Sequence, residues 1–257
     1  MKKVFIAILP LFTFLSLGFV AGVAQASGLG QPSQEEVVRV NCDKGQSVQQ
    51  VLNRFLTRTK PLVLIIRGVC DEEIEVERDE VLFRGHETGG RITGDVRIDE
   101  AREFELGENM RIGRLLIPSG QAEVEVEEGS VVIDNGVILT GQSSLSLSSD
   151  GPGTITVNAD IEVENQSLLT TGFDESSSGG VVVNGGISFI LQSSGNLDGT
   201  GIANDLSLSQ DSHALFGVGV TVSGSVTCDR QSRLWGDVSG VTLLGADPDG
   251  VSCWGDI

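Results

Sequence analysis

Pairs of apolar residues two positions apart recur along the chain at a nearly constant interval. Successive pairs are separated by 22, 19, 22, 24, 26, 19 and 20 residues. Residues at i and i+2 of a strand point to the same face, so each pair predicts a short strand with both side chains buried. The pairs are Ile74/Val76, Val96/Ile98, Leu115/Ile117, Val137/Leu139, Ile161/Val163, Ile187/Phe189, Leu206/Leu208 and Val226/Cys228.

A second marker keeps the same interval. It is a small residue followed two or three positions later by an apolar one, and its steps are 21, 21, 24, 26, 19 and 20. Both markers therefore lengthen at the same places, as stacked coils would. The small residues are Ala101, Ala122, Ser143, Ser167, Ser193, Ser212 and Ser232.

Each repeat offers three short strand candidates separated by turns rich in Gly, Asn, Asp and Ser. In one repeat they are Val131–Ile133, Val137–Leu139 and Leu145–Leu147. Strands this short bury their apolar faces only when equivalent strands stack at a fixed period. The pattern therefore predicts an all-β parallel β-helix of about eight coils, with a two-sheet antiparallel sandwich as the alternative.

The segment before the repeat predicts one strand and one helix. Val37–Val40 forms a short strand, and Ser47 is suited to cap a helix that carries its apolar residues on one face. Pro61 prevents the helix from continuing. We expect 27–60 to be an N-terminal lead with a helix that caps the first sheet edge, and 61–257 to be the β-helix with a C-terminal cap. The apolar helical positions are Val48, Val51, Leu52, Phe55 and Leu56.

Residues 1–26 have the pattern of a signal peptide. Lys2 and Lys3 precede an apolar stretch, and Ala24-Gln25-Ala26 matches a small-x-small cleavage site. An uncleaved membrane anchor is the alternative. We expect a mature chain that begins at Ser27, is secreted or periplasmic in a bacterium, and does not insert into the membrane after cleavage.

Four cysteines in an exported chain indicate two disulfides, for which three pairings are possible. We favour Cys42–Cys70 and Cys228–Cys253, because each pair brackets one end of the repeat. A metal site is disfavoured since the chain has no C-x-x-C motif.

The N-terminal part of the repeat resembles a known family. The residues that carry the resemblance are Val40-Asn41-Cys42, Gly45, Ser47-Val48, Val51-Leu52, the run from Leu62 to Cys70, Ile74-Glu75-Val76, Asp79 and the run from Val81 to Gly85. They look like the cap and first coil of bacterial pectin-lyase-like right-handed parallel β-helix proteins. The resemblance implies a right-handed coil, and it implies little about function because that superfamily includes lyases, hydrolases, esterases and adhesins.

Charge excludes several partners. The expected mature chain has 15 basic and 36 acidic residues, a net charge of −21, which disfavours nucleic acid and anionic membranes. Residues 115–229 contain no Lys or Arg. That stretch therefore lacks both the base of a uronate lyase and a guanidinium to bind an acidic sugar.

Catalytic motifs are represented only by fragments. Of the motif set that the resemblance implies for polygalacturonase-like hydrolysis, Asn196-Leu197-Asp198 matches one element and the others are missing or out of order. Asp211-Ser212-His213 contains the residue types of a hydrolytic triad, but neighbours on a strand point to opposite faces. We therefore assign no catalytic residue, and no cofactor is expected.

Two groups of surface candidates remain. Glu105 and Glu125 are predicted at matching outward positions on adjacent coils, with Glu103 and Glu123 as near equivalents. Carboxylates about 4.8 Å apart would raise one another's pKa or bind calcium, unless interleaved arginines neutralise them; these are Arg97, Arg102, Arg111 and Arg114.

The chain has two tryptophans, Trp235 and Trp254, both near its C-terminal end. We expect them to pack as a cap over the last coil, with a platform for sugar rings as the alternative.

These observations favour a secreted, non-catalytic β-helix that acts as a surface, matrix or carbohydrate-binding element. The expected partners are polysaccharides or cell-surface components. The alternative is a carbohydrate-active enzyme, either a polysaccharide lyase or a glycoside hydrolase, or its inactive relative.

Overall fold

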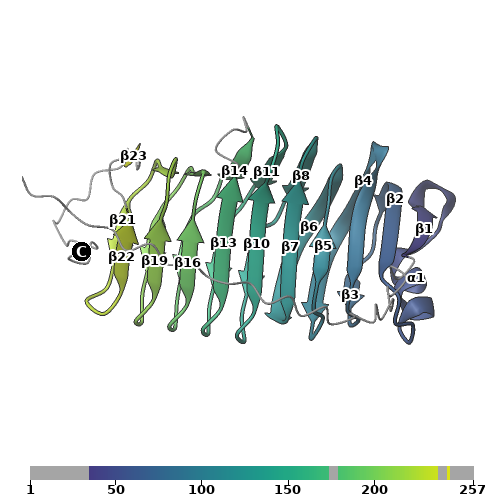
Figure 1. Ribbon diagram of the computed structural model, residues 1–257, viewed down its shortest axis with the longest axis horizontal. Coiled ribbons are helices and arrows are strands. Elements are labelled where there is room, and N and C mark those ends of the chain that lie inside the picture. Colours follow the sequence, from purple (N-terminus) through teal and green to yellow (C-terminus); the bar gives the residue numbers. More distant parts are fainter. Residues whose placement is uncertain (1–34, 174–178, 237–241, 244–257) are drawn as a thin grey trace, which may run out of the picture. The chain divides into compact units, whose positions relative to one another are not determined.

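A computed structural model describes residues 35–173, 179–236 and 242–243. These residues form a parallel β-solenoid of about nine turns with one α-helix near its N-terminal end (Figure 1). The chain from residue 33 onward is one compact unit. The predicted parallel β-helix is confirmed. It has about one turn more than the eight apolar pairs indicate, because β1 (Glu36–Asn41) and β2 (Leu62–Cys70) begin the coil before Ile74. The handedness of the coil stays a prediction.

The strands stack in three parallel sheets. Sheet 1 consists of β1, the first part of β2, the first part of β4 (Val81–Asp99), β5 (Phe104–Leu106), β7 (Gln121–Val126), β10 (Ser144–Ser149), β13 (Leu168–Phe173), β16 (Ser194–Leu197), β19 (His213–Phe216) and β22 (Arg233–Gly236).

Sheet 2 consists of the end of β2, the middle of β4, the first part of β6 (Met110–Ser119), β8 (Ser130–Ile133), β11 (Thr154–Val157), β14 (Gly180–Val183), β17 (Thr200–Ile202), β20 (Thr221–Val222) and β23 (Thr242–Leu243). Sheet 3 consists of β3 (Ile74–Val76), the ends of β4 and β6, β9 (Val137–Leu139), β12 (Ile161–Val163), β15 (Ile187–Phe189), β18 (Leu206–Leu208) and β21 (Val226–Cys228).

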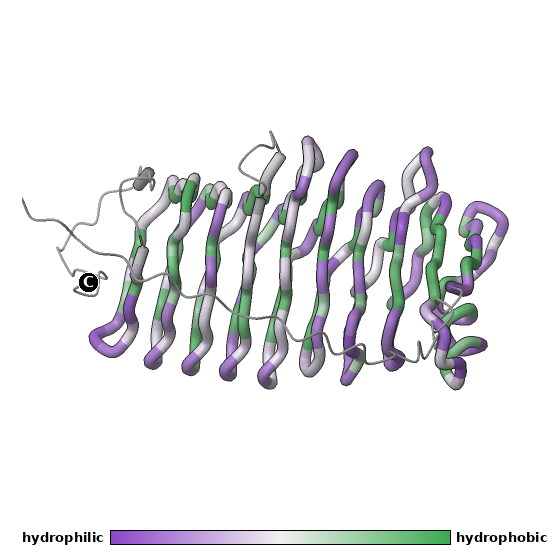
Figure 2. Tube along the Cα trace, in the orientation of Figure 1, coloured by the Kyte–Doolittle hydropathy of each residue, from purple (hydrophilic) through white to green (hydrophobic). Residues whose placement is uncertain are grey.

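The apolar pairs of the sequence are the inward residues of sheet 3. Ile74 lies in register with Val96, Val96 with Leu115, and the series continues without a shift to Val226. Apolar stretches accordingly line up from coil to coil in Figure 2. Each buried aliphatic side chain contributes roughly 1.5–3 kcal/mol. One coil cannot offset its own chain entropy, so the coils stabilise one another.

The serines of the second marker form a buried column at the corner before sheet 1. Ser143 Oγ donates to Ser167 Oγ at 3.3 Å, and the amides of Ser193 and Ser212 each donate to the serine hydroxyl of the next coil, at 3.3 and 3.2 Å. These hydroxyls are satisfied inside the fold, which explains why serine is tolerated there.

The assignment of Ala122 to this column was wrong. Ala122 lies in β7 opposite Leu145, whereas the amide of Ser144 donates to the carbonyl of Gly120. Gly120 therefore holds the position before β7 that Ser143 holds before β10. At this coil, the small residue of the sequence pattern is displaced by two positions. A shift of two residues keeps the same inward and outward alternation, so burial alone does not reveal it.

The same corner carries a ladder of glutamine amides. Gln142 Nε2 donates to Gln166 Oε1 at 2.9 Å, and Gln166 Nε2 donates to Gln192 Oε1 at 3.0 Å. All three residues have positive φ, between 63° and 70°. An exposed amide both donates and accepts, so identical side chains on stacked coils can bond in series.

Bulky core residues are matched with small ones. The rings of Phe83 and Phe104, on neighbouring coils, meet edge to face at 5.1 Å. Further along, Phe189 of sheet 3 reaches Gly195 of sheet 1, where a Cβ would lie 2.3 Å from its ring. Gly195 occupies an inward position held by Leu169 and Ala214 on the adjacent coils. The missing side chain at Gly195 makes room for the ring of Phe189.

Helix α1 (Val48–Phe55) covers the first coil and buries Val48, Leu52 and Phe55. Ser47 caps it as predicted, because its Oγ accepts from the amide of Gln50 at 3.1 Å. Glu72 of the following coil also binds this end: its carboxylate accepts from Ser47 Oγ at 2.6 Å and from the amide of Val48 at 2.7 Å. A carboxylate at a helix N-terminus is favoured by the helix dipole.

The helix also closes an exposed strand edge, as predicted. The amide of Glu75 in β3 donates to Gln49 Oε1 at 2.7 Å, and Gln49 Nε2 donates back to the carbonyl of Glu75 at 3.2 Å. The side chain of Gln49 thus replaces a neighbouring strand at this position. An edge blocked in this way is unavailable for pairing with another chain.

Arg78 anchors the opposite end of α1. Its guanidinium donates to the carbonyls of Phe55 at 2.9 Å and Lys60 at 2.6 Å, and the residue is 6% exposed. Burial lowers the pKa of Arg78, and this effect exceeds the opposing influence of Glu80, Glu36 and Asp79.

The predicted disulfide between Cys42 and Cys70 is present, with a Cα–Cα distance of 5.1 Å. It joins η1 (Cys42–Lys44) to the end of β2. In the chain-entropy model, a loop of this length contributes about 3–4 kcal/mol. Cys253 of the second predicted disulfide, Trp254 and the expected signal peptide lie outside the described residues. In the described part of the chain, no helix is long and apolar enough to span a bilayer.

We predict that Arg78→Gln lowers the free energy of unfolding by about 2–3 kcal/mol, because the buried guanidinium loses its hydrogen bonds to the carbonyl of Phe55 at the helix end and to the carbonyl of Lys60 in the following loop. Arg54→Gln, an exposed position on the same helix, is the control and should change the value by less than about 0.5 kcal/mol. Urea unfolding followed by circular dichroism measures both. Equal stabilities of the two variants would contradict the anchoring role of Arg78.

Candidate functional site

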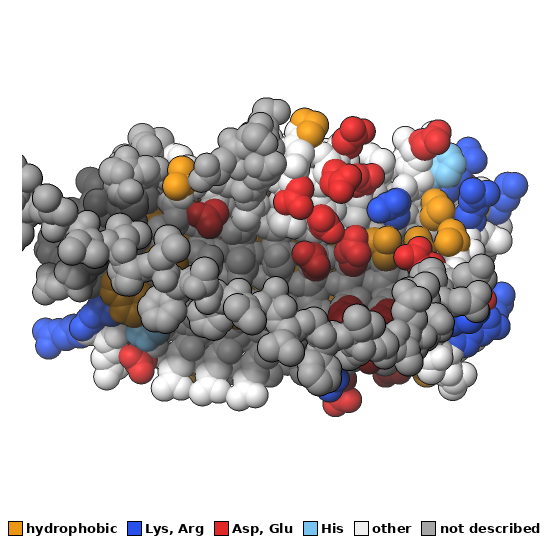
Figure 3. Space-filling view, viewed as in Figure 1, with side chains coloured by type: hydrophobic (Ala, Val, Ile, Leu, Met, Phe, Trp, Pro, Cys, Tyr) orange, Lys and Arg blue, Asp and Glu red, His pale blue; other side chains and the backbone are white. Residues whose placement is uncertain are grey.

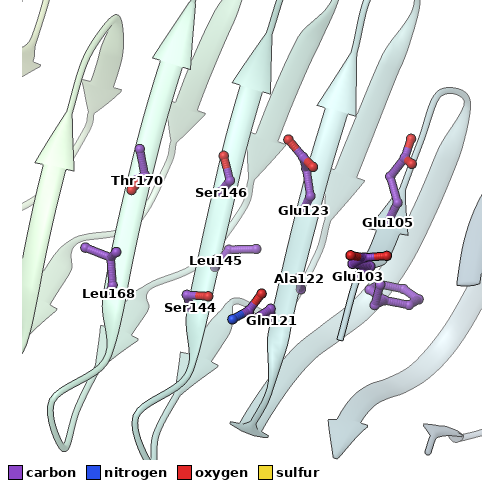
Figure 4. Close-up of a pocket in the computed structure, with 11 residues that line it drawn as sticks. Glu103, Glu105, Gln121, Ala122, Glu123, Ser144, Leu145, Ser146, Leu168 and Thr170 are labelled. Carbon is purple, nitrogen blue, oxygen red and sulfur yellow. The ribbon is translucent and has the colours of Figure 1, made fainter. Parts of the chain in front are cut away.

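The outer face of sheet 1 carries a shallow hollow of about 380 Å³. Side chains from β5, β7, β10 and β13 line it (Figure 4). Because adjacent strands are parallel and in register, outward side chains form rows that run from coil to coil at about 4.8 Å spacing. The hollow therefore lies across four coils, and equivalent positions line it.

Two outward rows cross this hollow. The upper row in Figure 4 contains Glu105, Glu123, Ser146 and Thr170, and the strand register extends it to Asn196, Leu215 and Trp235. The lower row contains Glu103, Gln121, Ser144 and Leu168, and continues to Ser194, His213 and Arg233. Carboxylates stand at one end of the rows, and hydroxyl and amide groups predominate in the middle, where Leu168 interrupts the lower row. At the far end the upper row has Leu215 and Trp235, and the lower row has His213 and Arg233.

The predicted pairing of Glu105 with Glu125 was wrong. Glu105 lies in register with Glu123, and Glu125 lies in register with Ser148. The cause is the same two-residue shift that displaced Ala122. Glu125 is nevertheless close enough to influence the titration of Glu105.

The electrostatics of this acidic group are unfavourable at neutral pH. Partial burial raises the pKa of Glu105, and the charges of Glu125 and Glu123 raise it further. The pKa of Glu125 is also raised, first by partial burial and then by Glu123. Arg84 acts in the opposite direction on both carboxyls. The rows therefore begin at a site that attracts protons and hydrogen-bond donors.

Of the four arginines predicted to neutralise these carboxylates, Arg97 and Arg111 pair with other acids, and Arg114 donates to the carbonyl of Asn135 at 3.3 Å. Arg111 makes a bidentate contact with Asp134 at 2.7 and 2.8 Å, and this hydrogen bond is the main reason that the pKa of Asp134 is lowered. Arg97 pairs with Glu75 at 3.8 Å and Asp99 at 3.1 Å. These pairs lie on sheets 2 and 3, so the carboxylates of sheet 1 remain accessible.

Trp235 occupies the far end of the upper row. Its ring stacks on His213 at 5.1 Å with an angle of 30° between the planes, and 38% of the residue is exposed. It points outward from β22, while its neighbour Leu234 is buried. The predicted packing of Trp235 as a cap over the last coil is therefore corrected: the indole lies on the outer face of sheet 1. His213 Nδ1 is buried without a hydrogen-bond partner among the described residues.

The carboxylate and hydroxyl oxygens of the rows accept hydrogen bonds, while the hydroxyl and amide groups also donate them. Exposed aromatic and aliphatic groups at the far end offer an apolar surface. Within the described ranges, the one group of side chains close enough to hold a metal is Cys42, Cys70 and Glu72. The two sulfurs form the disulfide and Glu72 binds the helix, so this group is structural.

Comparison of the chain with protein-family models, curated proteins and solved structures finds no match.

The raised pKa of Glu105 has a consequence for stability. The native state binds the Glu105 proton more tightly than the unfolded chain, so stability falls as pH rises from the ordinary value of 4.5 through the raised pKa. We predict that Glu105→Gln raises the Tm by roughly 1–3 °C at pH 7, from relief of about 0.2–1 kcal/mol of cross-strand repulsion. The gain should disappear as pH falls toward 4.5.

Glu162→Gln is the matched control for this measurement. Glu162 points outward from β12, where its in-register neighbours are Ile138 and Ser188, which carry no charge. Differential scanning calorimetry between pH 4 and 8 compares the variants. A gain for Glu105→Gln that is the same at every pH would contradict the electrostatic cause.

Proposed function

We propose that the protein is a secreted, non-catalytic β-helix that binds an extended neutral polysaccharide along the outer face of sheet 1. The observation that carries this proposal is the pair of outward rows. They place hydrogen-bonding groups on most successive coils, and the upper row ends at the exposed Trp235. A polymer with a regular succession of hydroxyl groups is the ligand class that such a repeated surface suits.

The chemistry of the rows agrees with a neutral ligand. Glu105 and Glu123 accept hydrogen bonds from sugar hydroxyls, and Ser146 and Thr170 both donate and accept them. Figure 3 shows acidic side chains gathered over the coils that follow the N-terminal end of the stack. Since 115–229 contains no Lys or Arg, an anionic polymer would be repelled along most of this face.

The absence of a deep cleft in the described part of sheet 1 supports a binding role over catalysis. The hollow is open to solvent along its length, so it excludes little water, and a catalytic site gains from a closed, preorganised environment. Export is supported by the signal-like residues 1–26 and by the Cys42–Cys70 disulfide, since disulfides persist in oxidising compartments.

One observation favours a second candidate, a glycoside hydrolase. Glu105 and Glu123 project in register from adjacent strands, which lie about 4.8 Å apart, and a retaining enzyme requires two carboxyl groups roughly 5–5.5 Å apart. The raised pKa of Glu105 suits this carboxyl to the general-acid role in such an enzyme. Release of reducing ends that Glu105→Gln abolishes would establish this second candidate and reject the first.

We predict that the mature protein binds at least one polysaccharide in a neutral panel, and that Trp235→Ala weakens this binding roughly 10- to 100-fold, the equivalent of losing about 1.5–3 kcal/mol of apolar contact. Thr170→Val should weaken it less, about 3- to 10-fold, because one hydrogen bond contributes about 0.5–1.5 kcal/mol. Affinity electrophoresis and isothermal titration calorimetry measure both variants.

The chain offers matched controls on sheet 2. Val182 is 39% exposed, nearly the same as Trp235, and Thr156 lies in register between Val132 and Val182 on that sheet. Val182→Ala and Thr156→Val should leave the affinity unchanged. The proposal that sheet 1 is the binding face would be overturned if the protein bound no member of the panel. It would also be overturned if the sheet 2 variants lost as much affinity as the sheet 1 variants.

A further inference from the structure

A second hollow, of about 530 Å³, lies at the N-terminal end of sheet 1, where β1, β2 and β4 meet. Three arginines line it: Arg39, Arg67 and Arg84. Arg39 and Arg84 flank Ile65 in the strand register, and Arg67 lies opposite Asn41. The hollow therefore has guanidinium groups on three successive strands around one aliphatic side chain.

These arginines are not used by the fold. All three are exposed, and none has a salt bridge or side-chain hydrogen bond within residues 35–173, 179–236 and 242–243. Arg84 acts on Glu105 and Glu125 only through longer-range attraction. Like charges on neighbouring strands repel one another, so a cluster of arginines without a direct partner in the described structure favours an anionic ligand.

An insertion forms the wall of the hollow. Between two registered pairs, Ile66 with Gly85 and Gly68 with Gly90, β2 has the single residue Arg67 and β4 has the four residues 86–89. The extra residues place His86 and the carboxylate of Glu87 beside the arginines, so the hollow holds three guanidinium groups and one acid. His86 Nδ1 accepts from the amide of Thr88 at 3.3 Å, which leaves the neutral ring protonated on Nε2 as one more donor.

Asn41 lies on the floor of the same hollow. Its Oδ1 is buried and has no hydrogen-bond partner among the described residues. A buried carbonyl oxygen without a partner is costly, and a rotation of the Asn41 side chain that exposes this oxygen to the hollow would let a hydroxyl group of a ligand bind it. Guanidinium groups, an imidazole N–H and this acceptor together form a set that suits an oxyanion carrying a neighbouring hydroxyl.

Local charge favours the same ligand class. Residues 35–68 contain six basic and three acidic residues, whereas residues 115–229 contain fifteen acidic and no basic residues. Figure 3 shows Lys and Arg side chains gathered at the end of the stack that carries β1 and α1. The hollow is thus a small positive region on a strongly negative protein, which admits a small anion and opposes a long polyanion.

We propose that this hollow is an anion-binding site, in which Arg39, Arg67 and Arg84 hold the carboxylate, sulfate or phosphate group of a small hydroxylated molecule. The guanidinium plane matches such groups with two parallel hydrogen bonds. The site is separate from the polymer-binding rows of sheet 1, and the proposal does not rest on them.

The test uses the mature protein at constant ionic strength, with chloride as the reference anion. Inorganic phosphate, sulfate, acetate and glycolate are titrated and followed by calorimetry and by the side-chain Nε–H signals of arginine in NMR spectra. At least one of these anions should bind at least tenfold more tightly than chloride. The affinities of phosphate and sulfate, compared with those of acetate and glycolate, identify which anionic group the site binds. Glycolate should bind more tightly than acetate if Asn41 accepts a hydrogen bond from its hydroxyl group.

Two variants locate the site. The double variant Arg39→Gln/Arg84→Gln should weaken binding at least tenfold, while Arg54→Gln, at another exposed arginine outside the hollow, should leave it unchanged. All three replaced side chains are exposed, so the Tm values in chloride should stay close to that of the parent protein. Binding no stronger than that of chloride, or equal losses in the double variant and the Arg54 control, would overturn the proposal.

Discussion

The structure depends on the register between parallel strands of successive coils. Backbone amides and carbonyls of one coil find their partners in the next, so a single coil satisfies neither its hydrogen bonds nor its apolar side chains. This dependence makes the first coil a weak point, because its outer edge has no preceding coil. The chain closes that edge with α1, whose Gln49 side chain pairs with the backbone of Glu75 as a strand would. Glu72 and Arg78 then hold the two ends of the helix against the coil that it protects.

Strand register also explains why one surface carries the candidate sites. Inward positions must be apolar, but outward positions of the same strands are free to vary, and each outward residue is repeated in space by its neighbours on adjacent coils. On sheet 1 this arrangement gathers Glu105, Glu123, Ser146 and Thr170 into a row although 65 positions separate the first from the last. The gradation from carboxylates to hydroxyls to the Trp235–His213 stack follows the order of the coils. Position along the row is therefore set by position in the sequence.

Local patterns predicted the fold well and the site only in part. The apolar pairs of sheet 3 were in register throughout, because both members lie on one short strand with fixed spacing. The pairing of Glu105 failed because the corner before sheet 1 varies in length, and a slip of two residues leaves the inward and outward pattern intact. The roles of Glu72, Arg78 and Gln49 could not be predicted, since each depends on contacts across 18 or more residues of sequence. The Gln142, Gln166 and Gln192 ladder had a detectable signal: a glutamine stands directly before every serine of the buried column except Ser212, which follows Asp211.

The insertion at 86–89 shows where this architecture accepts change. Four residues replace one at a corner, yet the strands on both sides stay paired with the preceding coil. The length of this corner can therefore vary without changing the pairing of the stacked strands. A lineage of such proteins could acquire or lose a ligand by lengthening one corner, without altering the pitch that sets the distances along sheet 1. Stability and recognition could then evolve separately in the same short chain.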